Sequence, residues 1–323
     1  MFFLLKVFCL DFSHFACHLL STDFMSIIRM TSTIRKAFPP RKIVCSYLYI
    51  IDRFDFQVKQ NKRNKRAGKI PEEEFLCVGI NNSVAAAYNN GVETITVTQS
   101  GSSSPYMSYL YGKMTDRFSF LPADCGLEND GDRTTMVFRS EKKYCPYIRN
   151  YTEENIADVI AVGYKYHFFD NLLSLPLLDA EKRDILITAL VAADYPEDRE
   201  YIRRRIRGLG EYCIDGVFNF HLRELKSRWN GIAEYIPAEF ASSSLQSFLE
   251  FLIGESTGKV FLKEGKLYDE EYRVLNRSAL IGRASPVREV ILSGADNIYC
   301  FGAPDPVTLE FLKKYYKEKV VFC

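Results

Sequence analysis

The repeat of apolar residues in the middle of the chain limits its fold more than any other feature of the sequence. After Thr152, apolar side chains recur every three or four residues, a spacing that places them on one face of a helix. Thr152 can cap this helix, and Pro176 would end it. A long amphipathic helix is therefore expected at the start of the central region. Its predicted apolar face consists of Ile156, Val159, Ile160, Tyr164, Phe168, Leu172 and Leu175.

Further helices are predicted after this one. Asp179 can cap a second helix, and Pro196 suits the first turn of a third. A stripe over residues 218–240, with spacings of three and four, indicates a long core-facing helix that Pro237 should kink or break. A shorter helix is expected over residues 245–253.

Strands are predicted on both sides of the helical centre. Ile95 and Val97 alternate with threonines, as in a half-buried strand, and Glu264 and Gly265 suit the turn of a hairpin. Asp305 can cap a last helix. The expected fold class is α+β, with a helix-rich central region, a small N-terminal β portion and a C-terminal β-hairpin plus α/β unit. The other predicted elements are strands at 75–80, 92–98, 134–139, 259–262, 266–269, 288–292 and 319–323, a loop at 99–105, an acidic turn at 124–132 and a helix at 271–284.

The net charge of +1 conceals a basic N-terminal part and an acidic body. Residues 24–70 carry 12 bases and 2 acids, whereas residues 71–323 carry 29 bases and 37 acids. The basic tract 59–69 is typical of a solvated linker. The predicted divisions are a basic extension over 1–70, either disordered or upstream of the true start codon, a small mostly-β portion over 71–150, and a helical and α/β domain over 151–323.

The cysteines and the N-terminal residues indicate a cytoplasmic protein. The nine cysteines are scattered singly, without a C-x-x-C pair, which favours reduced thiols. The apolar start is interrupted by Lys6 and ends at Asp11, too short for a transmembrane segment and unlike an export signal. We therefore expect a cytoplasmic chain with no transmembrane segment.

No motif for a cofactor or a metal survives inspection. Gly254, Gly258 and Lys259 resemble a phosphate-binding loop, but three residues instead of four separate the glycines, and Val260 stands where Ser or Thr would hold magnesium. The acidic turn lacks the residues of a calcium loop. No cofactor-binding or metal-ligating residue is predicted.

Catalytic residues are equally hard to find. Downstream of residue 70 the only histidines are His167 and His221. His167 belongs to the first predicted helix, where a hydrogen-bonded core or semi-buried role is expected, and His221 is expected on the surface. Neither has the context of a nucleophile and its base. No catalytic residue is predicted, although an enzyme that uses carboxylates alone stays open.

A run of arginines forms the sharpest local patch of charge. One interpretation is a contact to a polyanion or an acidic partner. The other is that the bases complement the dipole of a helix whose first turn is acidic, and four adjacent positions would spread around that helix instead of forming one stripe. We favour the second. The patch consists of Arg203, Arg204, Arg205 and Arg207.

Several stretches of the second half form a distinctive set: VFNFHLREL at 217–225, LYDE at 267–270, SALI at 278–281 with Pro286, the expected strand VIL at 290–292, and VVFC at 320–323. With these residues, the part of the chain over about 150–323 resembles the YtxC-like putative sporulation proteins of endospore-forming bacteria. The chain departs from that family in its N-terminal extension, in glycines 254 and 258 and in an insertion around 294–301. The resemblance implies a role in sporulation in the cytoplasm, with no catalytic residues to carry over.

These observations predict a non-catalytic accessory or interaction protein associated with sporulation, with an unknown protein partner. One alternative is a nucleic-acid or polyanion binder that uses the basic tract and the arginine patch. The acidic body makes this less favoured, because affinity for nucleic acid comes mostly from neutralising phosphates. A second alternative is an enzyme with unrecognised carboxylate chemistry.

Overall fold

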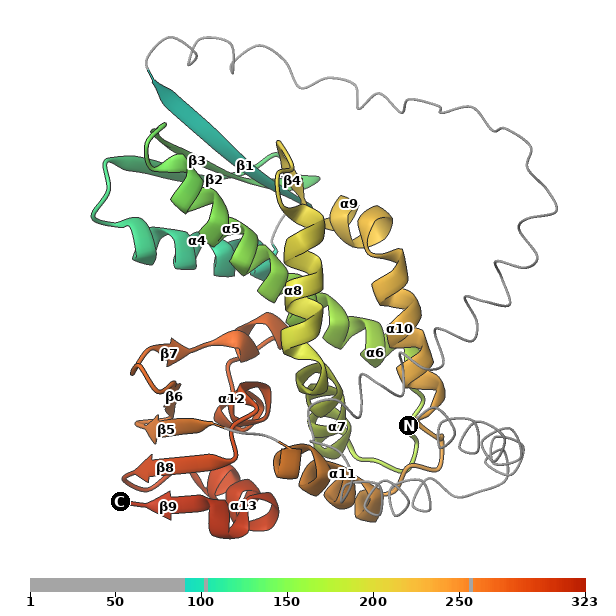
Figure 1. Ribbon diagram of the computed structural model, residues 1–323. Helices are drawn as coiled ribbons and strands as arrows, with labels where there is room; N and C mark the ends of the chain where they lie inside the picture. The colour runs from blue at the N-terminus through green and yellow to red at the C-terminus, as the bar shows by residue number, and fades with distance from the viewer. Residues whose placement is uncertain (1–90, 102–103, 256–257) are drawn as a thin grey trace, which may run out of the picture. The chain divides into compact units, whose positions relative to one another are not determined.

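A four-stranded sheet forms where the sequence alternates apolar and polar residues around Ile95. The computed structural model describes residues 91–101, 104–255 and 258–323 (Figure 1). The expected strand at 75–80 and the basic extension lie outside these residues. Strands β2, β3 and β1 pair antiparallel, and β4 joins β1 in parallel. The strands are β1 (Val92–Ser100), β2 (Ala123–Asn129), β3 (Arg133–Glu141) and β4 (Tyr212–Cys213).

Two expectations for this region are wrong. Most of the stretch 124–132 belongs to strand β2 and not to a turn. In addition, helix α4 (Pro105–Phe118) follows the first strand, although no helix was expected there. Its start is encoded locally, because the Ser104 side chain accepts hydrogen bonds from two backbone N–H groups of the first turn. Met107, Leu110 and Met114 are fully buried and form its apolar face.

The first central helix is longer than expected and contains a π-helical segment. Helices α5 (Cys145–Asp158), η3 (Val159–Tyr164) and α6 (Lys165–Leu172) follow one another without a break. The expected cap at Thr152 is wrong, because Thr152 is buried inside α5 and its hydroxyl donates to the Ile148 carbonyl.

The π-helical segment also changes which residues face the core. A π-helical turn holds more residues than an α-helical turn, so the apolar face rotates after it. Lys165 and Phe169 are fully buried, whereas Leu172, expected on the buried face, is 48% exposed. The predicted face is therefore correct up to Ile160. After it Tyr164 and Phe168 are half-buried, Leu172 is exposed, and Leu175 is buried but lies beyond the end of α6.

The next two helices confirm their predicted starts. The Asp179 carboxylate accepts a hydrogen bond from the backbone of the first turn of α7 (Ala180–Ala193). Pro196 lies in the first turn of α8 (Tyr195–Ile206).

The long stripe over 218–240 is divided among several helices. The π-helical segment η4 ends at His221, α10 ends at Glu234, and Pro237 follows, so the prediction that Pro237 breaks the helix is confirmed. The elements of this region are α9 (Ile214–Gly216), η4 (Val217–His221), α10 (Arg223–Glu234) and α11 (Ser242–Glu255).

The C-terminal part is an α/β unit built on a five-stranded sheet in the order β7-β6-β5-β8-β9. The predicted hairpin is confirmed. Its two turn residues, Glu264 and Gly265, both have positive φ, as a type I′ turn requires. Strands β5, β8 and β9 are parallel. The strands are β5 (Lys259–Lys263), β6 (Lys266–Tyr268), β7 (Val274–Leu275), β8 (Asn297–Phe301) and β9 (Val320–Phe322).

Two other expectations in this unit are wrong, and two more are confirmed. The stretch 271–284 is not an α-helix but holds β7 and the 3-10 helix η5 (Arg277–Ile281). The expected strand at 288–292 lies in helix α12 (Pro286–Ser293), which Ser285 caps. Asp305 caps α13 (Pro306–Tyr315) and the chain ends in β9, both as predicted.

These elements establish an α+β fold. The predicted boundary between residues 150 and 151 falls inside α5, and β4 pairs with β1 across it, so the described residues form one compact unit. Within the described segments, no helix combines the length and the apolar character needed to span a bilayer.

Candidate binding pocket

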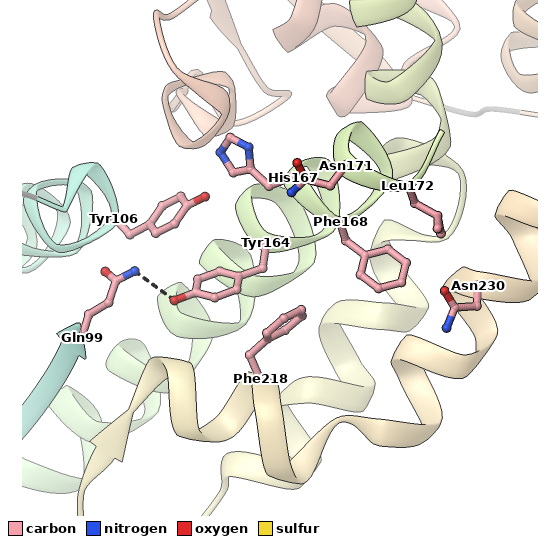
Figure 2. A pocket seen from close by; sticks show the side chains of 9 residues that line it. All are labelled: Gln99, Tyr106, Tyr164, His167, Phe168, Asn171, Leu172, Phe218 and Asn230. Atoms are coloured by element: carbon pink, nitrogen blue, oxygen red, sulfur yellow. Dashed lines mark hydrogen bonds between the residues drawn. The ribbon is translucent and has the colours of Figure 1, made fainter. Parts of the chain in front are cut away.

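A pocket of about 560 Å³ opens beside the π-helical segment η3 (Figure 2). Its walls come from β1, α4, the continuous helix η3–α6, η4 and α10, so five separate segments of the chain contribute to it. The lining side chains are Gln99, Tyr106, Tyr164, His167, Phe168, Asn171, Leu172, Phe218 and Asn230. With histidine counted as neutral, none of them is charged at pH 7.

Aromatic rings form the floor of the pocket. Tyr164 stacks on Tyr106 with 5.2 Å between ring centroids and lies 4.8 Å from Phe218. The rings of Phe168 and Phe218 both pack against Trp229, with 5.5 and 6.3 Å between ring centroids. Tyr164 and Phe218 belong to the two π-helical segments, a backbone form that is frequent at functional sites.

A chain of hydrogen bonds fixes one edge of this floor. The Ser104 hydroxyl donates to the Gln99 side-chain carbonyl, and the Gln99 amide donates to the Tyr164 hydroxyl at 2.9 Å. Tyr164 in turn donates to Asp215 at 2.6 Å, and the backbone N–H of Ser100 donates to the other Asp215 oxygen at 2.7 Å. Burial and the Asp215 carboxylate raise the pKa of Tyr164 well above its ordinary value, so its phenol stays protonated and serves as a fixed donor.

A buried ion pair supports the floor from behind. The Lys165 ammonium lies 2.7 Å from the Asp198 carboxylate, and neither side chain is more than 3% exposed. The indole N–H of Trp229 donates to the same Asp198 oxygen at 2.8 Å. Because Trp229 also contacts two of the lining phenylalanines, this pair holds the rings in place.

Four polar side chains around the floor have no hydrogen-bond partner among the described residues. They are the Tyr106 hydroxyl, the His167 imidazole and the amides of Asn171 and Asn230. Figure 2 shows Tyr106 on one side of the rings and Asn230 on the other. Burial raises the pKa of Tyr106 to about 12, so it too remains a hydroxyl at neutral pH. The pocket therefore offers uncharged donors and acceptors above an aromatic surface.

His167 differs from its expected environment. The sequence predicted a core or semi-buried role, but the side chain is exposed at the edge of the pocket, because η3 rotates this part of the helix. The rings of Tyr106 and Tyr166 lie edge-on to it at 6.5 and 5.7 Å. His221 is exposed on the surface, as predicted.

The arginine patch lies on α8 and does not contribute to the lining of the pocket. Its three members within the helix pair with carboxylates, and Arg207, just after the helix, is exposed. These pairs reduce the positive charge that the patch can offer to a polyanion. They join Arg203 to Glu154 and Glu200, Arg204 to Glu200, and Arg205 to Glu224.

The elements around Gly254 and Gly258 are not arranged as in a phosphate-binding loop. A phosphate-binding loop leads from a strand into a helix, whereas helix α11 precedes this segment and strand β5 follows it. Over residues 91–101, 104–255 and 258–323, no three His, Cys, Asp or Glu side chains gather as metal ligands would.

Sequence reasoning found few of the pocket residues. Tyr164, Phe168 and Leu172 were assigned to one apolar face, but nothing in the sequence joined them to Gln99 or Asn230. The sequence carried no signal for the two π-helical segments either.

Searches of protein-family models, curated proteins and solved structures find no match to this chain.

Proposed function

We propose that this chain is a non-catalytic interaction protein whose pocket receives an aromatic side chain of a partner protein. The observation that carries this proposal is the aromatic floor surrounded by uncharged polar groups that lack partners among the described residues. Asn171 and Asn230 each offer a donor and an acceptor, which match the C=O and N–H groups of a peptide backbone.

The dimensions and chemistry of the pocket suit such an anchor. A volume of about 560 Å³ lies within the range of specific binding sites. Aromatic side chains seated in pockets often dominate the energy of protein interfaces, and ring pairs add about 0.5–1.5 kcal/mol beyond the area they bury. The absence of charge among the lining residues favours an uncharged anchor over Lys, Arg, Asp or Glu.

The arrangement of titratable groups supports a non-catalytic role. A catalytic histidine needs a nucleophile beside it and a group that orients it. Among the described residues, His167 has no acidic or thiol partner. Asp215 accepts hydrogen bonds from Tyr164 and Ser100 instead, and the raised pKa of Tyr164 opposes a phenolate.

We also propose that the interaction serves sporulation in the cytoplasm. This part of the proposal is supported by the resemblance of residues 150–323 to YtxC-like proteins and by the scattered cysteines. Deleting the gene should lower the yield of heat-resistant spores. A normal spore yield would contradict the assignment to sporulation but would leave the pocket proposal to its own test.

The pocket can be tested with small peptide mimics. N-acetyl-L-tyrosinamide and N-acetyl-L-tryptophanamide should receive saturation transfer from the protein in ligand-observed NMR, while N-acetyl-glycinamide, which lacks a ring, should not. Two lost hydrogen bonds of about 1 kcal/mol each should weaken binding to an Asn171→Ala/Asn230→Ala variant about 10- to 30-fold. Asn276→Ala is the matched control, since Asn276 is exposed and does not line the pocket. Equal binding of all three probes, or an unchanged double variant, would refute the proposal.

A further inference from the structure

Among the described residues, helices cover one face of the C-terminal sheet and none covers the other. The parallel connections β5 to β8 and β8 to β9 run in the same direction across the sheet, and right-handed connections of this kind place their helices on the same side. Helices α12 and α13 lie in these connections (Figure 1). On the covered face Val260, Leu262, Ile298 and Cys300 are at most 3% exposed. The alternate residues of the same strands point to the opposite, open face.

The open face carries a continuous row of apolar and aromatic side chains. Phe261 is its centre, with ring centroids 5.6 Å from Tyr299 and 6.2 Å from Phe301. Phe301 is 44% exposed. The strand register aligns one residue from each of the five strands in this row: Val274, Tyr268, Phe261, Tyr299 and Val321.

A further ring is held over this row by an unusual backbone conformation. Tyr272 has a φ of 59°, which is rare for a bulky residue. Asp269 fixes the turn, because its backbone carbonyl accepts the Tyr272 N–H and its carboxylate accepts the Arg273 N–H. The Tyr272 ring stacks on Phe261, with centroids 4.8 Å apart and planes 8° apart, and remains 67% exposed.

Three lysines flank the aromatic row on the same face. Lys259 and Lys263 lie two positions on either side of Phe261 in β5, and Lys266 is opposite Lys263 in the hairpin. All three are exposed, and within the described part of the chain none of their ammonium groups has an ion-pair partner. The five strands contain no Asp or Glu. The strands therefore give the open face aromatic rings and three lysines. The nearest acids lie in the connecting turns, where Asp269 and Glu271 pair with Arg273 and the Glu270 carboxylate accepts the backbone N–H of Lys259.

We propose that this face binds single-stranded nucleic acid. Exposed rings on a sheet provide platforms for unpaired bases, and nearby lysines attract the phosphates between them. Charge complementarity selects this occupant: a purely apolar partner would leave the three lysines unpaired, and a duplex would hide its base faces from the rings. The proposal uses no residue of the pocket, so either proposal can fail without the other.

The test uses the full chain and fluorescein-labelled 12-nucleotide dT and rU strands, with binding followed by fluorescence anisotropy. Neutralising three phosphate contacts on a single strand predicts a slope of about −2 in a plot of log K against log salt. A Lys259→Ala/Lys263→Ala/Lys266→Ala variant should lose most of this slope. Lys313→Ala/Lys314→Ala is its matched control, because these two exposed lysines lie on α13, the helix that covers the other face.

The aromatic part of the proposal is tested separately. Loss of one stacked base typically lowers affinity at least about fivefold, so Tyr272→Ala/Phe301→Ala should weaken binding by about 25-fold or more. Tyr235→Ala is the control, since Tyr235 is 57% exposed and lies outside the C-terminal sheet. The fluorescence of Trp229, remote in sequence from every substitution on the sheet, checks that the variants remain folded.

The outcomes distinguish this face from other sources of binding. Binding of only one of the two strands, with loss of affinity in both the lysine variant and the Tyr272→Ala/Phe301→Ala variant, supports the proposal and shows that the face distinguishes dT from rU. Equal affinity for a 12-base-pair duplex would overturn it. Binding that survives both variants but disappears when the lysines and arginines of 59–69 are replaced would assign the affinity to that tract. A chain that binds no strand, but forms a dimer that Tyr272→Ala/Phe301→Ala dissociates, would make a second copy the occupant and also overturn the proposal.

Discussion

Removing either partner of the buried pair between Lys165 and Asp198 should destabilise the fold far more than removing both. Both side chains are nearly inaccessible to water, and their charged atoms lie 2.7 Å apart. A single substitution leaves an uncompensated charge in the interior, which typically costs about 3–5 kcal/mol. This is a large part of the 5–15 kcal/mol by which a typical domain is stable.

The surroundings predict which single substitution is worse. In Lys165→Met, the Asp198 carboxylate keeps the indole N–H of Trp229 at 2.8 Å and has the Arg228 guanidinium at 3.6 Å, so the loss should be near the lower limit, about 3 kcal/mol. In Asp198→Asn, the ammonium of Lys165 loses the carboxylate closest to it and keeps the Val191 carbonyl at 3.4 Å, the faces of nearby rings, a neutral amide oxygen and the attraction of the Asp194 carboxylate. This loss should approach about 5 kcal/mol.

The double variant removes both charges while an amide oxygen at position 198 can still accept the indole N–H. Its loss should be about 1–2 kcal/mol, less than that of either single variant. Urea denaturation followed by the fluorescence of Trp229, the single tryptophan of the chain, measures all four proteins with one buried reporter. If the losses of the single variants simply add in the double variant, the pair does not act as a coupled unit and the reasoning fails.

Two further predictions follow from the surroundings of the pocket. Gly163→Ala would place a methyl group 2.5 Å from the Tyr106 ring and should destabilise the fold by about 1–3 kcal/mol. Gly231→Ala in helix α10, where the new methyl group meets nothing within 4 Å, should stabilise it by about 0.5–1 kcal/mol. Thermal unfolding compares the two variants, and equal effects would contradict the packing around η3. Burial raises the pKa of Tyr106 from 10.0 to about 12 and also raises the pKa of Tyr164. Between these pKa values the folded state therefore keeps protons that the unfolded state releases. The contribution of these tyrosines to stability should therefore be constant below about pH 10 and should fall as the pH approaches 12, less steeply in Tyr106→Phe. Urea midpoints that do not fall over this pH range would contradict the predicted direction of the change.

Features set by neighbouring residues could be predicted from the sequence. Asp179 and Asp305 cap helices, and Glu264 with Gly265 forms the hairpin turn, because caps and turns depend on the chemistry of a few adjacent residues. The α+β class followed from the same local patterns. The missed helix α12 had such a signal too, since Ser285 precedes a proline, but the apolar run after it was interpreted as a strand.

The tertiary structure decided which side chains share a surface. The π-helical turn before Lys165 depends on packing against neighbouring elements, and it moved a lysine into the core and His167 to the edge of the pocket. The pocket itself joins residues as far apart in the sequence as Gln99 and Asn230. The aromatic row on the open face of the C-terminal sheet depends on the strand register that aligns Phe261 with Tyr299. A sequence states the order of these residues, but only the balance of burial among all the packed elements determines which of them meet.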